Sequence, residues 1–317
     1  MRSISIGKYF GIKVYLHYTW FLIVALISYF LATGFFPQSF PDLSVTEYWT
    51  FGILSAILLF VSVLMHELSH SVVAKYLKLK VASITLFFFG GVASIDEDHM
   101  TPKKEFLMSI AGPMLSLCLA AFFFATYKFS PLFSIQAISS YLFRINIAIA
   151  LFNMVPGFPL DGGRVFRSIV WGITKDHAKA TRMASNGGRI FAYFLFVVGL
   201  TNVLFGDALG LWFVVLGGFL LFITTLSYEQ ALIQNLLKSK KAKDFVEEHL
   251  YTHAPKIKAN TPAYKVFAQM SKNKITYANV YKGKDFLGII RLSDLVRFVH
   301  KKNMVDFVKK HHMQEVE

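Results

Sequence analysis

Residues 48–70 read YWTFGILSAILLFVSVLMHELSH, and this stretch decides the fold. Its first eighteen positions carry no charged side chain and are mostly apolar, which is typical of a membrane-spanning helix. Two histidines and a glutamate, His66, Glu67 and His70, close the stretch. A charge near the centre of a membrane helix costs about 3 kcal/mol on insertion scales. Three ionisable residues within five positions therefore predict a functional site.

The spacing of the two histidines favours a metal site. Four residues of an α-helix turn through about 400° and rise about 6 Å, so His66 and His70 stack on one face within reach of one ion. Glu67 lies about 100° around the helix, where it can act on a metal-bound water. The arrangement is the HExxH pattern. The alternative is a cytoplasmic helix end whose polar side chains reach the membrane interface.

The composition indicates an integral membrane protein. Hydrophobic residues make up 55% of the 317 positions and charged residues 16%, whereas soluble domains average about 25% charged residues. The net charge of +14 is explained by Lys and Arg in cytoplasmic loops, so we expect no nucleic-acid partner. The only cysteine, Cys118, excludes an intramolecular disulfide.

Apolar runs predict six membrane spans, at about 18–36, 48–70, 106–127, 138–160, 190–205 and 209–227. Lys and Arg cluster in alternate connections, which predicts that both termini are cytoplasmic. We therefore expect a multi-pass protein of a prokaryotic plasma membrane, in contact with the lipid bilayer. We interpret Gly112 and Pro113, within the third span, as residues that allow close helix packing.

Residues 81–98 do not fit a span, because the run is short, rich in β-branched and aromatic residues, and broken by Gly90 and Gly91. They predict a β-hairpin, either re-entrant in the membrane or an ordinary cytoplasmic one. An extended substrate could bind beside Gly90 and Gly91 as an added strand. The expected fold is an all-α polytopic membrane protein with about six transmembrane helices and a membrane-associated β-hairpin.

From near residue 248 the composition is typical of a soluble domain. This change predicts a membrane domain at 1–228, a basic linker at 229–247 and a small soluble α/β domain at 248–317. In the last of these, Thr261 as N-cap and Pro262 in the first turn predict a helix that extends to about residue 270. Two short strands, at 275–281 and 286–290, and a helix from about 293 should follow.

A catalytic zinc site needs three protein ligands and one open position. The best candidate for the third ligand lies in residues 153–164, NMVPGFPLDGGR. Pro156 and Pro159 break the fourth span at its cytoplasmic end. The second span ends on the same side, so Asp161 should lie at a depth similar to that of the histidines. The alternative is a Pro/Gly loop with a turn aspartate.

These two segments together resemble the motifs of the site-2 protease family of intramembrane zinc metalloproteases. HELSH matches the first motif. The second matches at Asn153, Pro156, Asp161 and Gly162, with the family's next proline offset by one residue. The resemblance implies one Zn²⁺ held by His66, His70 and Asp161, with Glu67 as general base. It also implies a substrate that is a transmembrane segment of another protein.

Asn153 is, by this resemblance, an oxyanion donor or a substrate-positioning group. The alternative is an amide that satisfies the backbone of the broken helix. A different activity would also suit these ligands, because a zinc transporter or a metal-sensing membrane protein could bind the ion in the same way. Glu67 beside the first ligand favours the protease, since transport would not require a general base.

The C-terminal segment from Thr261 to about residue 299 resembles one CBS (cystathionine β-synthase) motif, in which Asp294 matches the acidic residue. The resemblance implies binding of ATP or another adenosine nucleotide. Arg291 stands where serine or threonine is usual, which counts against a nucleotide. A single motif would pair with a second subunit, so nucleotide sensing and plain homodimerisation both stay open.

Overall fold

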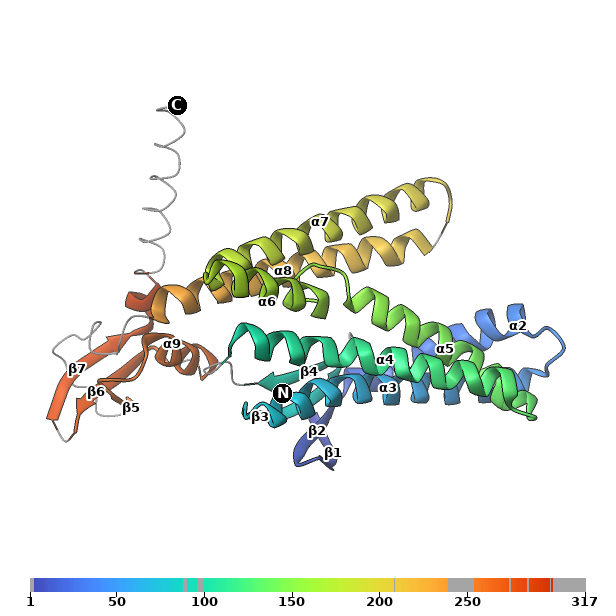
Figure 1. Cartoon of the computed structure of the whole chain (residues 1–317), viewed down its shortest axis with the longest axis horizontal. Coiled ribbons are helices and arrows are strands. Elements are labelled where there is room, and N and C mark those ends of the chain that lie inside the picture. The colour runs from blue at the N-terminus through green and yellow to red at the C-terminus, as the bar shows by residue number, and fades with distance from the viewer. Residues whose placement is uncertain are drawn as a thin grey trace. The chain divides into compact units, whose positions relative to one another are not determined.

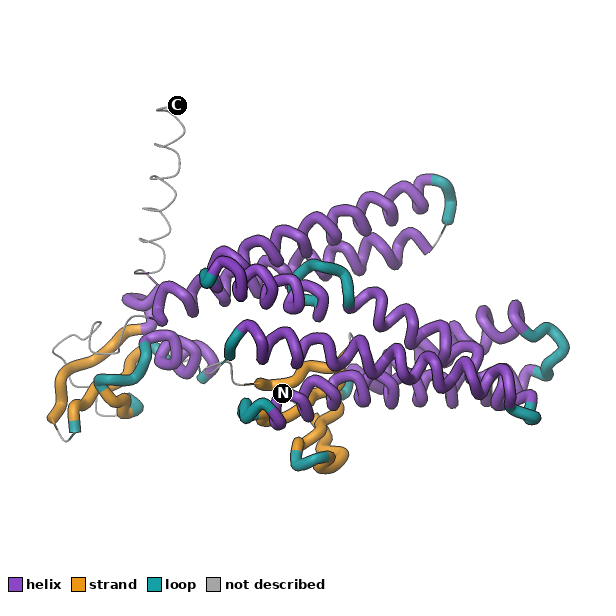
Figure 2. The backbone as a smooth tube through the Cα atoms, viewed as in Figure 1, coloured by secondary structure: helices purple, strands orange, loops and turns teal. Residues whose placement is uncertain are grey.

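The computed structural model describes residues 3–87, 90–95, 100–207, 209–238, 254–273, 275–283, 285–296 and 298. The chain divides into two compact units, Met1–Thr224 and Thr225–Glu317. The first unit is mostly helical, and the second contains the end of a long helix, a short helix and a small sheet (Figures 1 and 2).

Most helices of the first unit follow the predicted apolar runs. They are α1 Thr19–Phe30, the π-helical η1 Leu31–Phe35, α2 Phe36–Ser39, α3 Val45–Tyr76, α4 Pro102–Phe129, α5 Phe133–Asn153, α6 Asp161–Thr174, α7 His177–Leu204 and the start of α8 Leu209–Lys238. Within the described residues, five segments are long and apolar enough to cross a membrane: Thr19–Ser39, α3, α4, α5 and α7. The sixth predicted span corresponds to the shorter apolar helix Gly210–Leu226.

The helix that carries HExxH has clear start and stop signals. Ser44 and Glu47 form a capping box, in which each side chain accepts a hydrogen bond from the other residue's backbone N–H. The helix ends at Tyr76, shortly before Lys78, whose φ of +61° leaves the helical region. Its 32 residues span about 48 Å, more than the hydrocarbon thickness of about 30 Å.

The fourth predicted span was wrong at its end. Helix α5 stops at Asn153, not at residue 160. Pro156 and Pro159 cannot continue a helix, so residues 154–160 form a loop. A further helix, α6, which the sequence did not predict, begins directly at Asp161. The proposed third ligand is thus the first residue of a helix.

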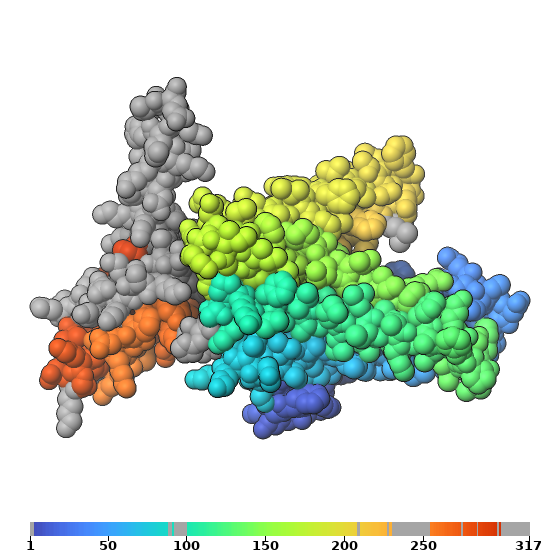
Figure 3. Space-filling view, in the orientation of Figure 1, coloured from blue at the N-terminus to red at the C-terminus, as the bar shows by residue number. Residues whose placement is uncertain are grey.

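The predicted hairpin is present as β3 (Val81–Phe87) and β4 (Gly90–Ile95), which pair antiparallel. It belongs to a larger sheet of order β1-β2-β3-β4, in which β1 (Ser3–Tyr9) is antiparallel to β2 (Ile12–His17), and β2 is parallel to β3. The all-α expectation with an isolated hairpin therefore needs correction. The N-terminal strand pair projects from the side of the helical body (Figure 3, dark blue).

The second unit contains β5 (Lys256–Lys258), α9 (Ala263–Lys272), β6 (Tyr277–Lys282) and β7 (Asp285–Arg291). Strand β5 is parallel to β6, and β6 is antiparallel to β7. The predicted helix, both strands and a helical stretch at 292–296 are present, although the helix takes Pro262 rather than Thr261 as its N-cap. Of the expected linker, residues 229–238 continue α8, and residues 239–247 lie outside the described residues.

Candidate metal centre

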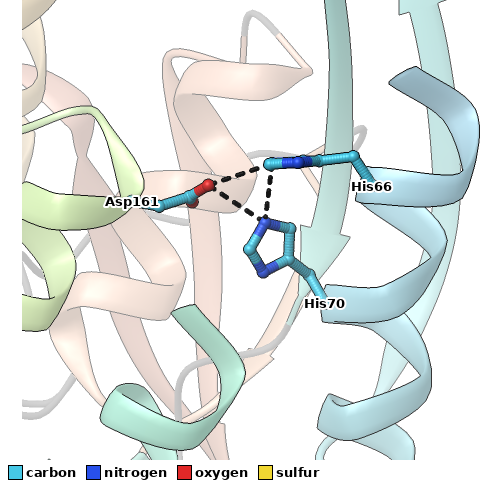
Figure 4. A group of neighbouring side chains, drawn as sticks. All are labelled: His66, His70 and Asp161. Atoms are coloured by element: carbon cyan, nitrogen blue, oxygen red, sulfur yellow. Dashed lines mark hydrogen bonds and ion pairs between the residues drawn. The ribbon is translucent and has the colours of Figure 1, made fainter. Parts of the chain in front are cut away.

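Three side chains from two helices converge on one point (Figure 4). His66 and His70 extend from α3, and their Nε2 atoms lie 3.2 Å apart. Asp161, at the start of α6, places Oδ2 at 3.0 Å from Nε2 of His66 and at 3.1 Å from Nε2 of His70. Both histidines are buried, with 4% and 7% of their surface exposed. Within the described residues these three form the one group that could hold a metal ion.

Helix α4 fixes the orientation of both imidazoles. Nδ1 of His66 lies 2.9 Å from the hydroxyl of Ser116, and Nδ1 of His70 lies 2.6 Å from the backbone carbonyl of Met108. A carbonyl can only accept, so Nδ1 of His70 carries a proton, and Nε2 is the ring nitrogen left to bind a metal. Such hydrogen bonds set the tautomer and the ring direction of metal-binding histidines. Both Nε2 atoms therefore face the shared point, where they could hold one metal ion.

Gly112 of α4 leaves this point open. A methyl group built on Gly112 would lie 2.1 Å from Nε2 of His70 and 2.5 Å from Nε2 of His66. A zinc–nitrogen bond is about 2.0–2.1 Å long. The missing side chain thus leaves space at metal–ligand distance from both imidazoles. Our interpretation of Gly112 as a contact between helices was therefore incomplete, because the residue also packs against the two histidines.

The residues fit a catalytic zinc site. Two imidazoles and one carboxylate are a common ligand set for catalytic zinc, and three ligands leave the fourth position for water or substrate. Asp161 lies outside the five candidate spans. Burial raises its pKa, but hydrogen bonds with His66 and His70 outweigh this and hold the pKa below its ordinary value. Asp161 is thus held as the anion that a metal requires.

Glycines allow the loop before Asp161 to pack closely against its neighbours. A methyl group on Gly163 would lie 2.2 Å from the backbone of Gly157, and one on Gly188 of α7 would lie 2.1 Å from the carbonyl oxygen of Phe158. The amide of Phe158 donates to the carbonyl of Ala184 at 3.0 Å. The loop is therefore fixed against α7, which sets where α6 begins.

A buried ion pair joins α6 to α4. Arg167 of α6 donates through Nε to Oε1 of Glu105 at 2.8 Å and makes a second, shorter contact through its terminal nitrogen. Both side chains are almost fully buried, and the guanidinium lies 4.7 Å from the ring centroid of Phe158. Breaking one partner of such a pair costs about 3–5 kcal/mol. The pair holds the Asp161 helix against the helix that orients both histidines.

Glu67 and the expected substrate strand lie side by side. Glu67 is half-buried on α3, and a methyl group on Gly91 of β4 would stand 2.5 Å from its Cγ. The strand therefore passes directly against the proposed general base, and Gly91 provides the room for it. Gly90 is the first residue of the same strand. The structure thus brings the proposed base and the glycine strand together.

Two predicted residues do not join this group. Asn153, the last residue of α5, donates its amide to the carbonyl of Ile149 at 3.0 Å, which is the backbone-satisfying alternative. Its role in catalysis stays a prediction. Asp294 lies in the helical stretch 292–296 of the second unit and is half-buried. Its role in nucleotide binding also stays a prediction.

Sequence reasoning missed the contribution of α4. Glu105, Gly112 and Ser116 are seven and four residues apart, so they share one helical face with Met108. That face meets α6 through Glu105 and the histidines through its other members. The stripe of polar and small residues along this otherwise apolar helix could have indicated its contact with the site.

Comparison with known proteins points to one family. The family model for peptidase family M50 matches residues 54–137 and 130–198. "Putative zinc metalloprotease sll0528" from Synechocystis sp. is 40% identical over 247 residues, which cover 77% of this chain and 65% of the relative. "Putative zinc metalloprotease MJ0611" from Methanocaldococcus jannaschii is 30% identical over 158 residues, which cover 44% of this chain and 81% of the relative.

A solved structure is also similar. The site-2 protease from Methanocaldococcus jannaschii superposes with a TM-score of 0.51 and 29% sequence identity. The match covers 72% of this chain and 95% of that structure. The chain spans less than two thirds of the length of the Synechocystis relative, namely 65%.

Proposed function

Because the chain belongs to peptidase family M50, we propose that it is an intramembrane zinc peptidase that cleaves a transmembrane segment of another protein. The observation that carries this proposal is the group of His66, His70 and Asp161, whose ligand atoms lie within 4.8 Å of one another. The two histidines belong to a helix long and apolar enough to cross a membrane. Such a helix gains nothing from ionisable residues unless they serve a function.

The chemistry follows from the positions of these residues. When bound, zinc lowers the pKa of a water toward about 7 and polarises the scissile carbonyl. His66, His70 and Asp161 would hold the ion, and the open side at Gly112 leaves room for it. Glu67, one residue after the first ligand, takes the proton of the attacking water and later delivers it to the leaving amine. Asn153 is proposed to position the substrate or its oxyanion, after releasing its present bond to Ile149.

Strand β4 is proposed to bind the substrate. It is an edge strand of the sheet, so its free backbone groups can pair with an extended peptide. Its contact with Glu67 would bring that peptide next to the base. Methylating alternate backbone amides of a substrate near the cut should slow its cleavage, and an unchanged rate for every methylated form would reject this pairing.

The loop charges predict cytoplasmic termini, and the C-terminal unit is predicted to be CBS-like. The order of helix and strands in the second unit supports the latter. Adenosine nucleotide binding and homodimerisation through this unit stay predictions.

Reconstitution tests the activity against the alternative of zinc transport. The purified protein in liposomes should cleave a co-reconstituted model transmembrane substrate. A zinc chelator should stop the reaction, and added zinc should restore it, because the ligands supply no other electrophile. Zinc flux into the liposomes is measured in the same samples. Zinc flux without cleavage would contradict the proposal and favour a transporter.

A further inference from the structure

Arg144 is a charged residue in the middle of a predicted membrane span. Helix α5 is a candidate span, and Arg144 lies eleven residues after its first residue and nine before its last. These separations correspond to about 16 and 14 Å of helix. The guanidinium is therefore too deep to reach either interface by snorkelling. Its charge needs a partner at this depth.

The described part of the protein offers this charge only a weak partner. Arg144 is exposed, and its guanidinium carbon lies 5.6 Å from the ring centroid of Phe35, at the end of η1. Within the described part of the chain it makes no hydrogen bond or ion pair. A cation–π contact at an exposed site is worth about 0.5–1 kcal/mol, less than the cost of about 3 kcal/mol for a charge at mid-span. Arg144 therefore has no anionic partner among the described residues.

Arg144 lies on an exposed face of α5. Arg144, Ala148 and Leu151 follow the helical spacing of one face, and all three are exposed. The face ends at Leu151, two residues before the end of α5 and the loop that leads to Asp161. Asn146 lies on the opposite side of α5 and is buried. Unlike Arg144 it has a polar partner, because its amide donates to the hydroxyl of Ser62 at 3.2 Å.

This bond also fixes the depth of Arg144 relative to the zinc ligands. Ser62 lies one turn before His66 on α3, and Arg144 lies two residues before Asn146 on α5. The two helices run in the same direction through the first unit (Figure 1). Taking Ser62 and Asn146 at the same depth, His66 lies four residues beyond that depth and Arg144 lies two residues before it. Arg144 and His66 therefore differ in depth by about 9 Å. This distance equals about six residues of a helical segment.

We propose that Arg144 recognises a carboxylate within the transmembrane segment of the substrate, about six helical residues from the scissile bond. The inference rests on the proposed peptidase function. An anionic lipid headgroup cannot meet the guanidinium, because headgroups lie at the interface. A transmembrane segment with an Asp or Glu at mid-span can, and each charge would offset the cost of burying the other.

The test uses matched model substrates that differ at one position. A glutamate is placed in turn at three to nine residues from the cut, on the side away from the cytoplasmic end, and each form is compared with its glutamine counterpart. The parent enzyme should prefer glutamate near the sixth position by about tenfold in kcat/KM. Arg144→Met should reduce this ratio to about one, and Arg144→Lys should keep part of it. Arg144→Glu should reverse the preference toward a lysine at the same position.

Each outcome decides the question. Zinc content of every variant shows whether it has folded. A parent enzyme that cleaves both substrate forms equally at every position overturns the proposal, even if Arg144→Met fails to fold. A preference that survives Arg144→Met overturns it too. If instead Arg144→Glu changes the oligomeric state and no preference exists, a second copy of the chain occupies this face. Cleavage of neither form by the parent would contradict the peptidase function itself.

Discussion

Glu67→Gln is expected to keep zinc and to lose cleavage. The amide has nearly the shape of the carboxylate, so the contact with Gly91 and the fold of α3 should persist. It cannot accept the proton of the attacking water, and general base catalysis contributes about 10²–10⁴-fold to a rate. Cleavage of a model transmembrane substrate should therefore fall by about 10³-fold, whereas zinc per chain stays at the parent value.

Glu47→Gln is the matched control, since Glu47 lies on the same helix but at its capped N-terminus. Glutamine can also accept in a capping box, so this variant should cleave like the parent. A Glu67→Gln protein with parent-like cleavage would show that another group takes the proton. Loss of zinc in the same variant would make Glu67 a ligand and contradict its role as a base.

Gly112→Ala should lose zinc. The added methyl group would stand at bonding distance from both Nε2 atoms, where we place the ion. Overpacking of this size costs about 1–3 kcal/mol, which a folded protein can tolerate by small shifts. The metal cannot share the position, so zinc affinity should fall by more than about 100-fold, beyond the usual effect of changing a supporting residue. Zinc titration of the purified variant measures it.

Gly218→Ala is the control for this variant, because a methyl group at Gly218 of α8 would meet nothing within 4 Å. It should bind zinc like the parent. A Gly112→Ala protein that keeps zinc at parent affinity would show that the ion lies elsewhere, or that the two histidines do not share it.

The candidate membrane helices and the three proposed ligands could be predicted because the signals are local. An apolar run defines a span, and four residues on a helix place two histidines together. Asp161 followed from the proline break and from the topology. The helix that begins at Asp161 could not be predicted, because Gly162 and Gly163 are poor helix formers. Their close contacts with the preceding loop explain the helix.

The other features depend on contacts between distant segments. Strands β1 and β2 are short, and β2 is fixed by parallel pairing with β3, whose partner residues lie seventy positions later. The hydrogen bonds between α4 and the two histidines join residues 38 and 50 positions apart. No local pattern shows such pairs. The Glu105–Arg167 pair is hidden for the same reason, although two opposite charges on apolar helices suggest a partner.

The zinc content of the purified protein tests the central claim most directly. Measured per chain beside Asp161→Ala, the parent should contain one zinc and the variant close to none, since two imidazoles alone bind the ion weakly. Asp176→Ala is the matched control, because Asp176 only caps the start of α7. It should retain the metal. Equal zinc in the parent and in Asp161→Ala, or none in the parent after growth and purification with zinc, would contradict the account.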